Sequence, residues 1–132
     1  SIKALDPGKY QWRLLVRTAS GYRATPYKTF VVLPPAPQLS SPENNYTFYT
    51  LNTPSLEFTW SESAGADSYL IEVNNRSDFK GTGISDSITT GDEEIDLPMS
   101  LSAGKYYWRV AAVNYLGNTT YSAVRTLTVK TP

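Results

Sequence analysis

The sequence predicts an all-β protein, a seven-stranded antiparallel sandwich preceded by a separate β-hairpin. Apolar and polar residues alternate along several short segments, which is the period of a half-buried strand. Clusters of turn-forming residues separate these segments at intervals of about 8–12 residues, a spacing typical of sandwiches. Ten Tyr and nine Pro among 132 residues also favour strands and turns over helices.

Each strand is placed by its own pattern. Residues 56–60 and 69–73 alternate apolar and polar side chains, and 106–113 does the same around two aromatic residues. A run rich in β-branched residues predicts the last strand. The seven strands are expected at 38–41, 56–60, 69–73, 84–89, 93–97, 106–113 and 124–129.

One segment occurs twice. GKYQWRLLV at residues 8–16 recurs as GKYYWRVAAV at 104–113, so that Trp12 corresponds to Trp108. A period of almost 100 residues indicates tandem globular modules rather than a solenoid. The sequence therefore predicts a partial module at 1–33 that holds only the last two strands. A Pro-rich linker is expected at 34–37 and a complete module at 38–132.

The complete module resembles a fibronectin type III domain, an Ig-like β-sandwich. The resemblance rests on a Trp in the second strand, a Tyr in the third, a proline-rich entry and a corner before the sixth strand, LSAGKY at 101–106. The corner departs from the family pattern, since it is one residue short and has Ala103 where the first copy keeps Pro7. The runs FTWSESAGADSYLIEV and YYWRVAAVN are similar to bacterial members of the family.

The aromatic residues of these motifs are expected to form the core. Trp60 and Trp108 are predicted to face each other across the two sheets, and the resemblance implies a bond from the Tyr106 hydroxyl to the preceding loop. A lone hairpin would leave Trp12 without a core, so homo-association of the 1–33 hairpin, or packing on a neighbouring edge strand, is expected. The predicted core residues are Trp12, Trp60, Tyr69, Tyr106 and Trp108.

The composition excludes several kinds of chemistry. The chain has neither Cys nor His, which excludes disulfides, Cys/His zinc sites and His-based triads. The acidic segment DEEID at 92–96 is interpreted as a solvated turn, with a weak Ca²⁺ site or a carboxylate pair as alternatives. No catalytic residue, metal ligand or cofactor is therefore predicted.

The net charge is zero but unevenly distributed. Residues 1–33 carry six basic residues and one acidic residue, and residues 101–132 carry four basic residues and no acidic one. Residues 38–100 carry two basic and eleven acidic residues. Because both copies of the repeated segment are basic, the basic N-terminal part is interpreted as a property of the repeat and not as a nucleic-acid-binding arm. No apolar run is long enough to predict insertion into a membrane.

Two groups of aromatic residues are candidates for binding a protein or a glycan. The first lies in the segment 45–54, between the first two strands, which is interpreted equally as a strand continuation that packs inward on alternate residues. The second lies on and beside the last two strands. The candidates are Tyr46, Phe48, Tyr49, Tyr107, Tyr115 and Tyr121. Three Asn-x-Ser/Thr triplets begin at Asn45, Asn75 and Asn118, and each is either a glycosylation acceptor or a simple turn.

The function expected from these features is non-catalytic. The chain is interpreted as part of a larger modular protein, bacterial and located at the cell surface, in the periplasm or outside the cell. Its modules would act as spacers or as a platform for protein interaction and adhesion, with neighbouring modules as partners. The alternative is a carbohydrate-binding module, or an accessory module of a larger polysaccharide-acting enzyme.

Overall fold

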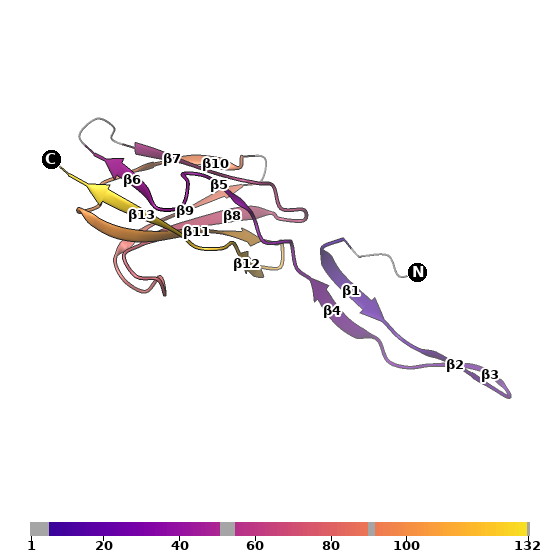
Figure 1. Cartoon of the computed structure of the whole chain (residues 1–132). Coiled ribbons are helices and arrows are strands. Elements are labelled where there is room, and N and C mark those ends of the chain that lie inside the picture. Colours follow the sequence, from indigo (N-terminus) through magenta and orange to yellow (C-terminus); the bar gives the residue numbers. More distant parts are fainter. Residues whose placement is uncertain (1–5, 51–54, 90–91, 132) are drawn as a thin grey trace.

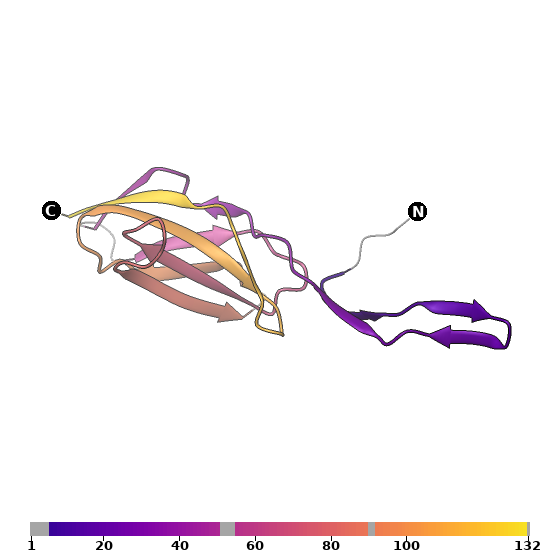
Figure 2. The same cartoon turned by 90° about the horizontal axis from the view of Figure 1, so that it is seen from below.

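A computed structural model describes residues 6–50, 55–89 and 92–131, and in these ranges the chain forms strands and no helix. A long hairpin comes first and a β-sandwich follows it (Figure 1). The predicted turn at 89–92 and the aromatic segment 45–54 lie partly outside the described residues. Figure 2 shows that the hairpin projects from one end of the sandwich, while the last strand ends at the other.

The hairpin has two paired stretches. β1 (Gly8–Trp12) pairs antiparallel with β4 (Lys28–Val32), next to the sandwich. Farther out, β2 (Leu15–Thr18) pairs antiparallel with β3 (Gly21–Ala24) and forms the tip.

The sandwich consists of two sheets. The first has the order β10-β7-β5, with β10 at Glu94–Pro98, β7 at Ser55–Trp60 and β5 at Leu39–Ser41. The second has the order β6-β13-β11-β8-β9, with β6 at Tyr46–Tyr49, β13 at Arg125–Lys130, β11 at Gly104–Val113, β8 at Ser68–Asn74 and β9 at Gly83–Thr89. The short strand β12 (Thr119–Tyr121) pairs with the end of β11.

All seven predicted strands are present, and the structure adds β6 and β12 to them. β6 pairs in parallel with β13, so the first strand of the module begins in one sheet as β5 and continues in the other as β6. A strand continuation in this segment is one of the two interpretations of the sequence, but the change of sheet has no sequence signal, because a strand of four residues is short and its partner is about 80 residues away.

The core lies between the two sheets and is dominated by aromatic rings. Trp60, Tyr69 and Trp108 are buried, and the two tryptophans come from opposite sheets, as the sequence predicts. Trp108 meets Phe58 edge-on at 4.9 Å between ring centroids, and Trp60 meets Tyr69 edge-on at 5.6 Å. Each tryptophan therefore packs against a different ring from the opposite sheet, the geometry that aromatic quadrupoles favour.

The hairpin repeats the pairing of β11 with β13. Tyr10 lies opposite Phe30, and its counterpart Tyr106 lies opposite Leu127. The same correspondence continues outward, where β2 and β3 pair as β11 and β12 do. The local sequence alone is therefore sufficient to specify this strand register, although the two copies have different surroundings.

Side-chain hydrogen bonds repeat as well. The Tyr106 hydroxyl donates to the carbonyl oxygen of Ser102 at 2.8 Å, and the Tyr10 hydroxyl donates to that of Asp6 at 2.5 Å. This is the corner that the resemblance implied, and it occurs in both copies.

A second repeated bond closes the middle of each hairpin. The amide of Leu14 donates to the Thr25 hydroxyl at 2.8 Å, and the amide of Val110 donates to the Ser122 hydroxyl at 2.9 Å. The return bond runs from the Thr25 amide to the Leu14 carbonyl in one copy and from Ser122 to Val110 in the other.

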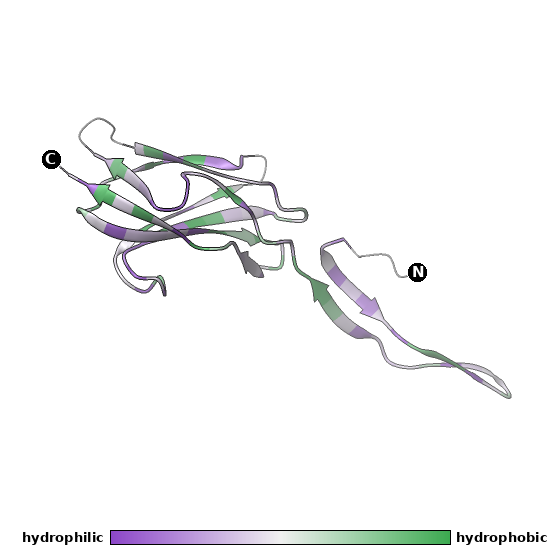
Figure 3. Cartoon of the chain, viewed as in Figure 1, coloured by the Kyte–Doolittle hydropathy of each residue, from purple (hydrophilic) through white to green (hydrophobic). Residues whose placement is uncertain are grey.

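The hairpin differs from its copy in exposure. Trp12 is 46% exposed, whereas Trp108 is fully buried, so the prediction that Trp12 is a core residue is wrong for this chain as it stands. The physical reason is that no opposing sheet covers the hairpin within the described residues, while β7 covers β11. Hydrophobic segments at the sandwich end of β4 and at the start of β2 lack a covering layer (Figure 3).

Candidate functional site

A groove lies where the first strand of the module changes sheets. β5 pairs only with Thr59 and Trp60, so in the described structure the first half of β7 has a strand neighbour on one side alone, β10. The open side forms a groove of about 420 Å³ between β6 and β7. It is lined by Tyr46, Phe48, Tyr49, Ser55, Leu56, Glu57 and Asp96.

The three aromatic candidates on β6 behave differently. Tyr49 is 56% exposed at one end of the groove, with the Lys130 ammonium 6.0 Å from its ring centroid. Tyr46 is half-buried and packs against the core. Phe48 is only 4% exposed and belongs to the core, so it cannot serve as the surface contact that the sequence suggested. Alternation along the strand turns Phe48 inward and leaves Tyr49 outside.

Two carboxylates complete the groove. Glu57 on β7 and Asp96 on β10 lie directly opposite each other in the strand register. Like charges in such a pair repel each other, so hydroxyl donors or a cation at this place would be favourable. The sequence placed Asp96 in the acidic segment 92–96 but did not connect it with Glu57, because only the pairing of β7 with β10 brings the two together. Alternation could have shown that Glu57 points away from the core, since its neighbour Phe58 is buried.

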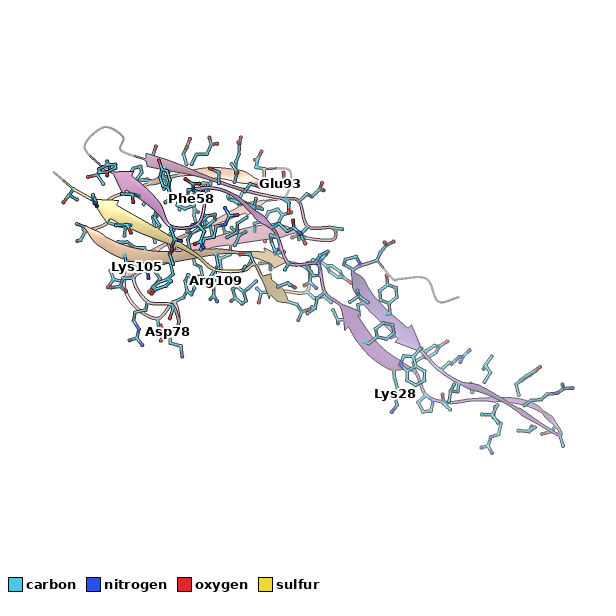
Figure 4. The ribbon with its side chains drawn as sticks, viewed as in Figure 1. Lys28, Phe58, Asp78, Glu93, Lys105 and Arg109 are labelled. Carbon is cyan, nitrogen blue, oxygen red and sulfur yellow. The ribbon has the colours of Figure 1, made fainter. Side chains whose placement is uncertain are left out.

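A second surface lies on the outer face of β11. The Arg109 guanidinium lies between the rings of Phe79 and Tyr121, 4.0 and 3.9 Å from their centroids. Its Nε donates to Glu72 Oε1 at 3.0 Å. Figure 4 shows Arg109 on this face, on the side of the loop that carries Asp78, and Phe58 in the interior. The charge of Arg109 is therefore paired within the module, and one face of Tyr121 is used.

The other aromatic candidates of this group are separate. Tyr107 is half-buried, with the Lys105 ammonium 5.4 Å from its ring centroid. Tyr115 is 64% exposed and lies in the turn after β11. The structure thus brings Tyr121 into the arginine stack, with Phe79 as the other ring.

The acidic segment is mostly solvated. Asp92, Glu94 and Asp96 are exposed, and the carbonyl of Glu93 accepts a hydrogen bond from the Trp60 amide at 3.0 Å. Across residues 6–50, 55–89 and 92–131, acidic side chains do not gather in groups of three or more that could hold a metal ion. The part of the chain that the structure describes also contains no helix long and apolar enough to span a bilayer.

The Asn residues of the three glycosylation triplets take part in loop hydrogen bonds. The Asn45 side chain accepts from the Thr126 hydroxyl, and the Asn75 side chain accepts from the Thr82 amide at 2.9 Å. The Asn118 oxygen lies 3.3 Å from the Asn114 amide nitrogen, which donates to it. The Asn75 and Asn118 bonds lie within loops, whereas the Asn45 bond joins the segment before β6 to β13.

One ionisable group in the core has a shifted pKa. The Tyr69 hydroxyl is buried and accepts a hydrogen bond from the Ser63 amide at 2.8 Å. Burial raises the pKa of Tyr69 above its usual value, the Ser63 amide partly opposes this, and the carboxylates of Glu93 and Glu62 raise it further. The bond fixes the loop that precedes β8 to the core.

Both faces of the hairpin expose apolar side chains without a covering layer in the described part of the chain. Tyr10 stacks on Phe30 at 5.4 Å between centroids, but the neighbouring apolar side chains remain open to solvent. The exposed apolar residues of this part are Trp12, Leu14, Leu15, Val16, Tyr22, Tyr27, Phe30, Val31 and Leu33.

Solved structures share this architecture. The FN1–FN3 domains of chicken CNTN1 superpose with a TM-score of 0.56 at 13% identity, over 94% of this chain and 44% of that one. An Fn3-like protein from Clostridium thermocellum gives a TM-score of 0.46 at 18% identity, over 75% of this chain and 94% of that one. No protein-family model and no curated protein sequence matches the chain. The arrangement of β10-β7-β5 against β6-β13-β11-β8-β9 is that of a fibronectin type III-like fold.

Proposed function

We propose that the chain is a non-catalytic part of a tandem array of fibronectin type III-like modules. The observation that carries this proposal is the hairpin, which reproduces β11, β12 and β13 in register and in side-chain hydrogen bonds. A hairpin of this kind is marginally stable alone, because one face of it must be buried. In the array, the hairpin belongs to a preceding module. The rest of that module, equivalent to residues 38–97, covers the hairpin as β7 covers β11.

The faces of the two copies support this assignment. Tyr106, Trp108 and Val110 point into the core of the complete module and are buried. Their counterparts in the hairpin are Tyr10, Trp12 and Leu14, which keep the apolar character but not the burial. Further support comes from the multidomain CNTN1 structure. Its match covers 94% of this chain and therefore includes part of the hairpin, because residues 38–132 alone make up a smaller share of the chain.

The array acts as a spacer in this proposal. The hairpin leaves one end of the sandwich and β13 finishes at the opposite end, so successive modules would follow one another along a line (Figures 1 and 2). Such an array holds other domains of a larger protein apart and offers module faces to protein partners. A bacterial surface, the periplasm or the extracellular space is the location that we propose for that protein.

The test is an extended chain in which a copy of residues 38–97 is fused to the N-terminal side of Ile2, at the position that the repeat defines. We expect Trp12 to become protected from acrylamide quenching, measured as the difference between the extended chain and its Trp12→Phe variant. The denaturant m-value should rise above that of the original chain, since it scales with the surface exposed on unfolding. The original chain and its own Trp12→Phe variant are the controls.

Two results would contradict the proposal. One is a Trp12 that remains as accessible in the extended chain as in the original chain. The other is a concentration-dependent dimer of the original chain, seen by sedimentation velocity, that already protects Trp12. The second result would assign the hairpin face to homo-association.

The groove favours a second function, the binding of a polysaccharide. An exposed Tyr49 ring offers a surface for a sugar ring, and Glu57 and Asp96 offer acceptors for sugar hydroxyls. The chain would then be a carbohydrate-binding module, or an accessory module of a polysaccharide-acting enzyme. Titration of soluble polysaccharides should give saturable binding that Tyr49→Ala abolishes and Tyr115→Ala, at a comparably exposed tyrosine, retains. A flat response to all polysaccharides would reject this function and leave the spacer.

A further inference from the structure

The hairpin is attached to the sandwich at two places. The first is the linker from β4 to β5, and the second is a contact between Pro7, just before β1, and Gly65 in the loop before β8. Gly8 pairs with Val32, so both attachments lie at the same end of the hairpin, one on each strand. Two attachments on neighbouring strands restrain the hairpin more than a single covalent link would.

The linker is fixed to the loop at 61–67. The Ser63 hydroxyl donates to the carbonyl oxygen of Pro35, and the Gln38 amide donates to the Ser61 hydroxyl at 2.9 Å. The Ser61 amide donates in return to the Gln38 carbonyl at 2.8 Å. Pro34 is fully buried. The proline-rich stretch is therefore part of the folded module and not a free tether.

The second attachment depends on a glycine. Gly65 has a φ of +81°, a conformation that side chains rarely adopt. A Cβ added to Gly65 would overlap with the Pro7 Cβ, far closer than two non-bonded carbon atoms can approach. The proline ring therefore packs directly against the backbone of the loop, and only a glycine at position 65 leaves room for it.

We infer that the loop at 61–67 is a docking surface for the corner of the preceding module, and that it sets the angle between consecutive modules. The partner is a corner segment of the type Asp6-Pro7-Gly8, which is held by the bond from Tyr10 to Asp6. This inference rests on the proposed array for the presence of a complete preceding module. It adds to the array a joint of fixed angle, where a flexible linker would allow a range of angles.

The repeat extends the inference to the other end of the module. The corner before β11 has the same backbone shape, since Gly104 has a φ of +153° and Gly8 has one of +154°. Ala103 stands at the position of Pro7 and is exposed. This corner would therefore contact the loop glycine of a following module. Ala103 would take the place of Pro7 in that contact and is the smaller side chain.

The test measures a distance between the hairpin and the sandwich. Because the chain has no Cys, spin labels can be attached specifically at Ser20→Cys in the hairpin tip and Ser87→Cys on β9. We expect pulsed electron paramagnetic resonance to give one narrow distance distribution. Gly65→Ala should displace or broaden it, because the added methyl group cannot coexist with Pro7.

Gly117→Ala is the matched control. Gly117 has a φ of +86°, close to that of Gly65, but an added Cβ there meets nothing within 4 Å. The two alanine variants therefore share the backbone cost and differ in the contact with Pro7. Gly117→Ala should leave the distance distribution unchanged.

A broad distance distribution in the original chain, or equal effects of the two alanine variants, would contradict the inference of a fixed joint. The same measurement in the extended chain separates this failure from failure of the array. If Trp12 is protected but the distance distribution is broad, the array is supported and the fixed joint is rejected. If the distribution is narrow and depends on Gly65 but Trp12 is not protected, the joint is supported and the array is rejected.

Discussion

The ring of Phe58 meets the ring of Trp108 edge-on across the two sheets, with 4.9 Å between their centroids. Trp12 occupies the same position as Trp108 in a hairpin of the same register, yet it is 46% exposed. The same residue type in the same local structure is therefore a core residue in one copy and a surface residue in the other. The opposing sheet makes the difference.

Replacement of Phe58 should show how much this contact contributes. Phe58 is fully buried, so Phe58→Ala removes its apolar surface from the core and leaves a cavity. We expect the free energy of unfolding to fall by about 3–5 kcal/mol in urea denaturation. The exposed Leu116→Ala should change it by less than about 0.5 kcal/mol. A loss below about 1 kcal/mol for Phe58→Ala would contradict the packing described for the core.

The two tyrosine corners provide a matched pair. Tyr106→Phe removes the hydroxyl that donates to Ser102 and should lower the free energy of unfolding of the sandwich by about 0.5–1.5 kcal/mol. Tyr10→Phe removes the equivalent bond to Asp6, outside the sandwich core. It should leave the unfolding of the sandwich unchanged, measured by the fluorescence of Trp60 and Trp108 in a Trp12→Phe background. Equal effects of the two changes would show that the hairpin and the sandwich unfold as one unit.

The raised pKa of Tyr69 predicts a loss of stability in alkali. Tyrosine is neutral when protonated, and in the unfolded chain it ionises near pH 10. The folded state holds the proton more tightly, because burial disfavours the anion. The contribution of Tyr69 to stability is therefore complete below about pH 10 and is lost as the pH rises from there through the raised pKa.

Urea denaturation between about pH 8 and pH 11 measures this loss. Tyr69→Phe should reduce the slope of stability against pH above about pH 10, while Tyr115→Phe, at an exposed tyrosine, should retain it. The Phe variant also leaves the Ser63 amide without its acceptor, so its stability should be lower by about 1–3 kcal/mol at neutral pH. An unchanged alkaline slope in Tyr69→Phe would contradict the assignment.

The arginine stack on β11 should be specific for a guanidinium. Arg109→Lys keeps the charge but loses the planar group that lies between Phe79 and Tyr121. We expect a loss of about 1–2 kcal/mol in the free energy of unfolding, from two cation–π contacts. A double-mutant cycle with Tyr121→Leu should give a coupling energy of about 0.5–1 kcal/mol. Additive effects of the two changes would show that the stack contributes nothing of its own.

Most strands could be predicted because their signal is local. The alternation at 56–60 and 106–113 depends on which side chains face the core, and β7 and β11 lie where it places them. The segment that forms β6 has two interpretations from sequence, exposed aromatic residues or a strand with alternate residues inside, and the structure shows the second, with Phe48 inside and Tyr49 outside. Its parallel pairing with β13 has no signal in its four residues.

The candidate site and the joint could be predicted only in part. The sequence drew attention to Tyr46 and Tyr49, but the two carboxylates of the groove come from strands that pair across 39 positions, Glu57 and Asp96. In the same way, nothing in the local sequence links Pro7 with Gly65, which are 58 positions apart. Contacts of this kind form only when the chain folds and brings distant segments next to each other.

Local sequence patterns are enough to specify the strand geometry of this protein. Both copies of the repeated segment form the same hairpin, with the same register and the same corner bond, because turn residues and alternation specify these features over short distances. Packing between segments that are distant in the sequence determines which copy has a core, where the groove lies and how the hairpin contacts the sandwich. Burial is a property of the opposing layer, and residues distant in sequence form that layer.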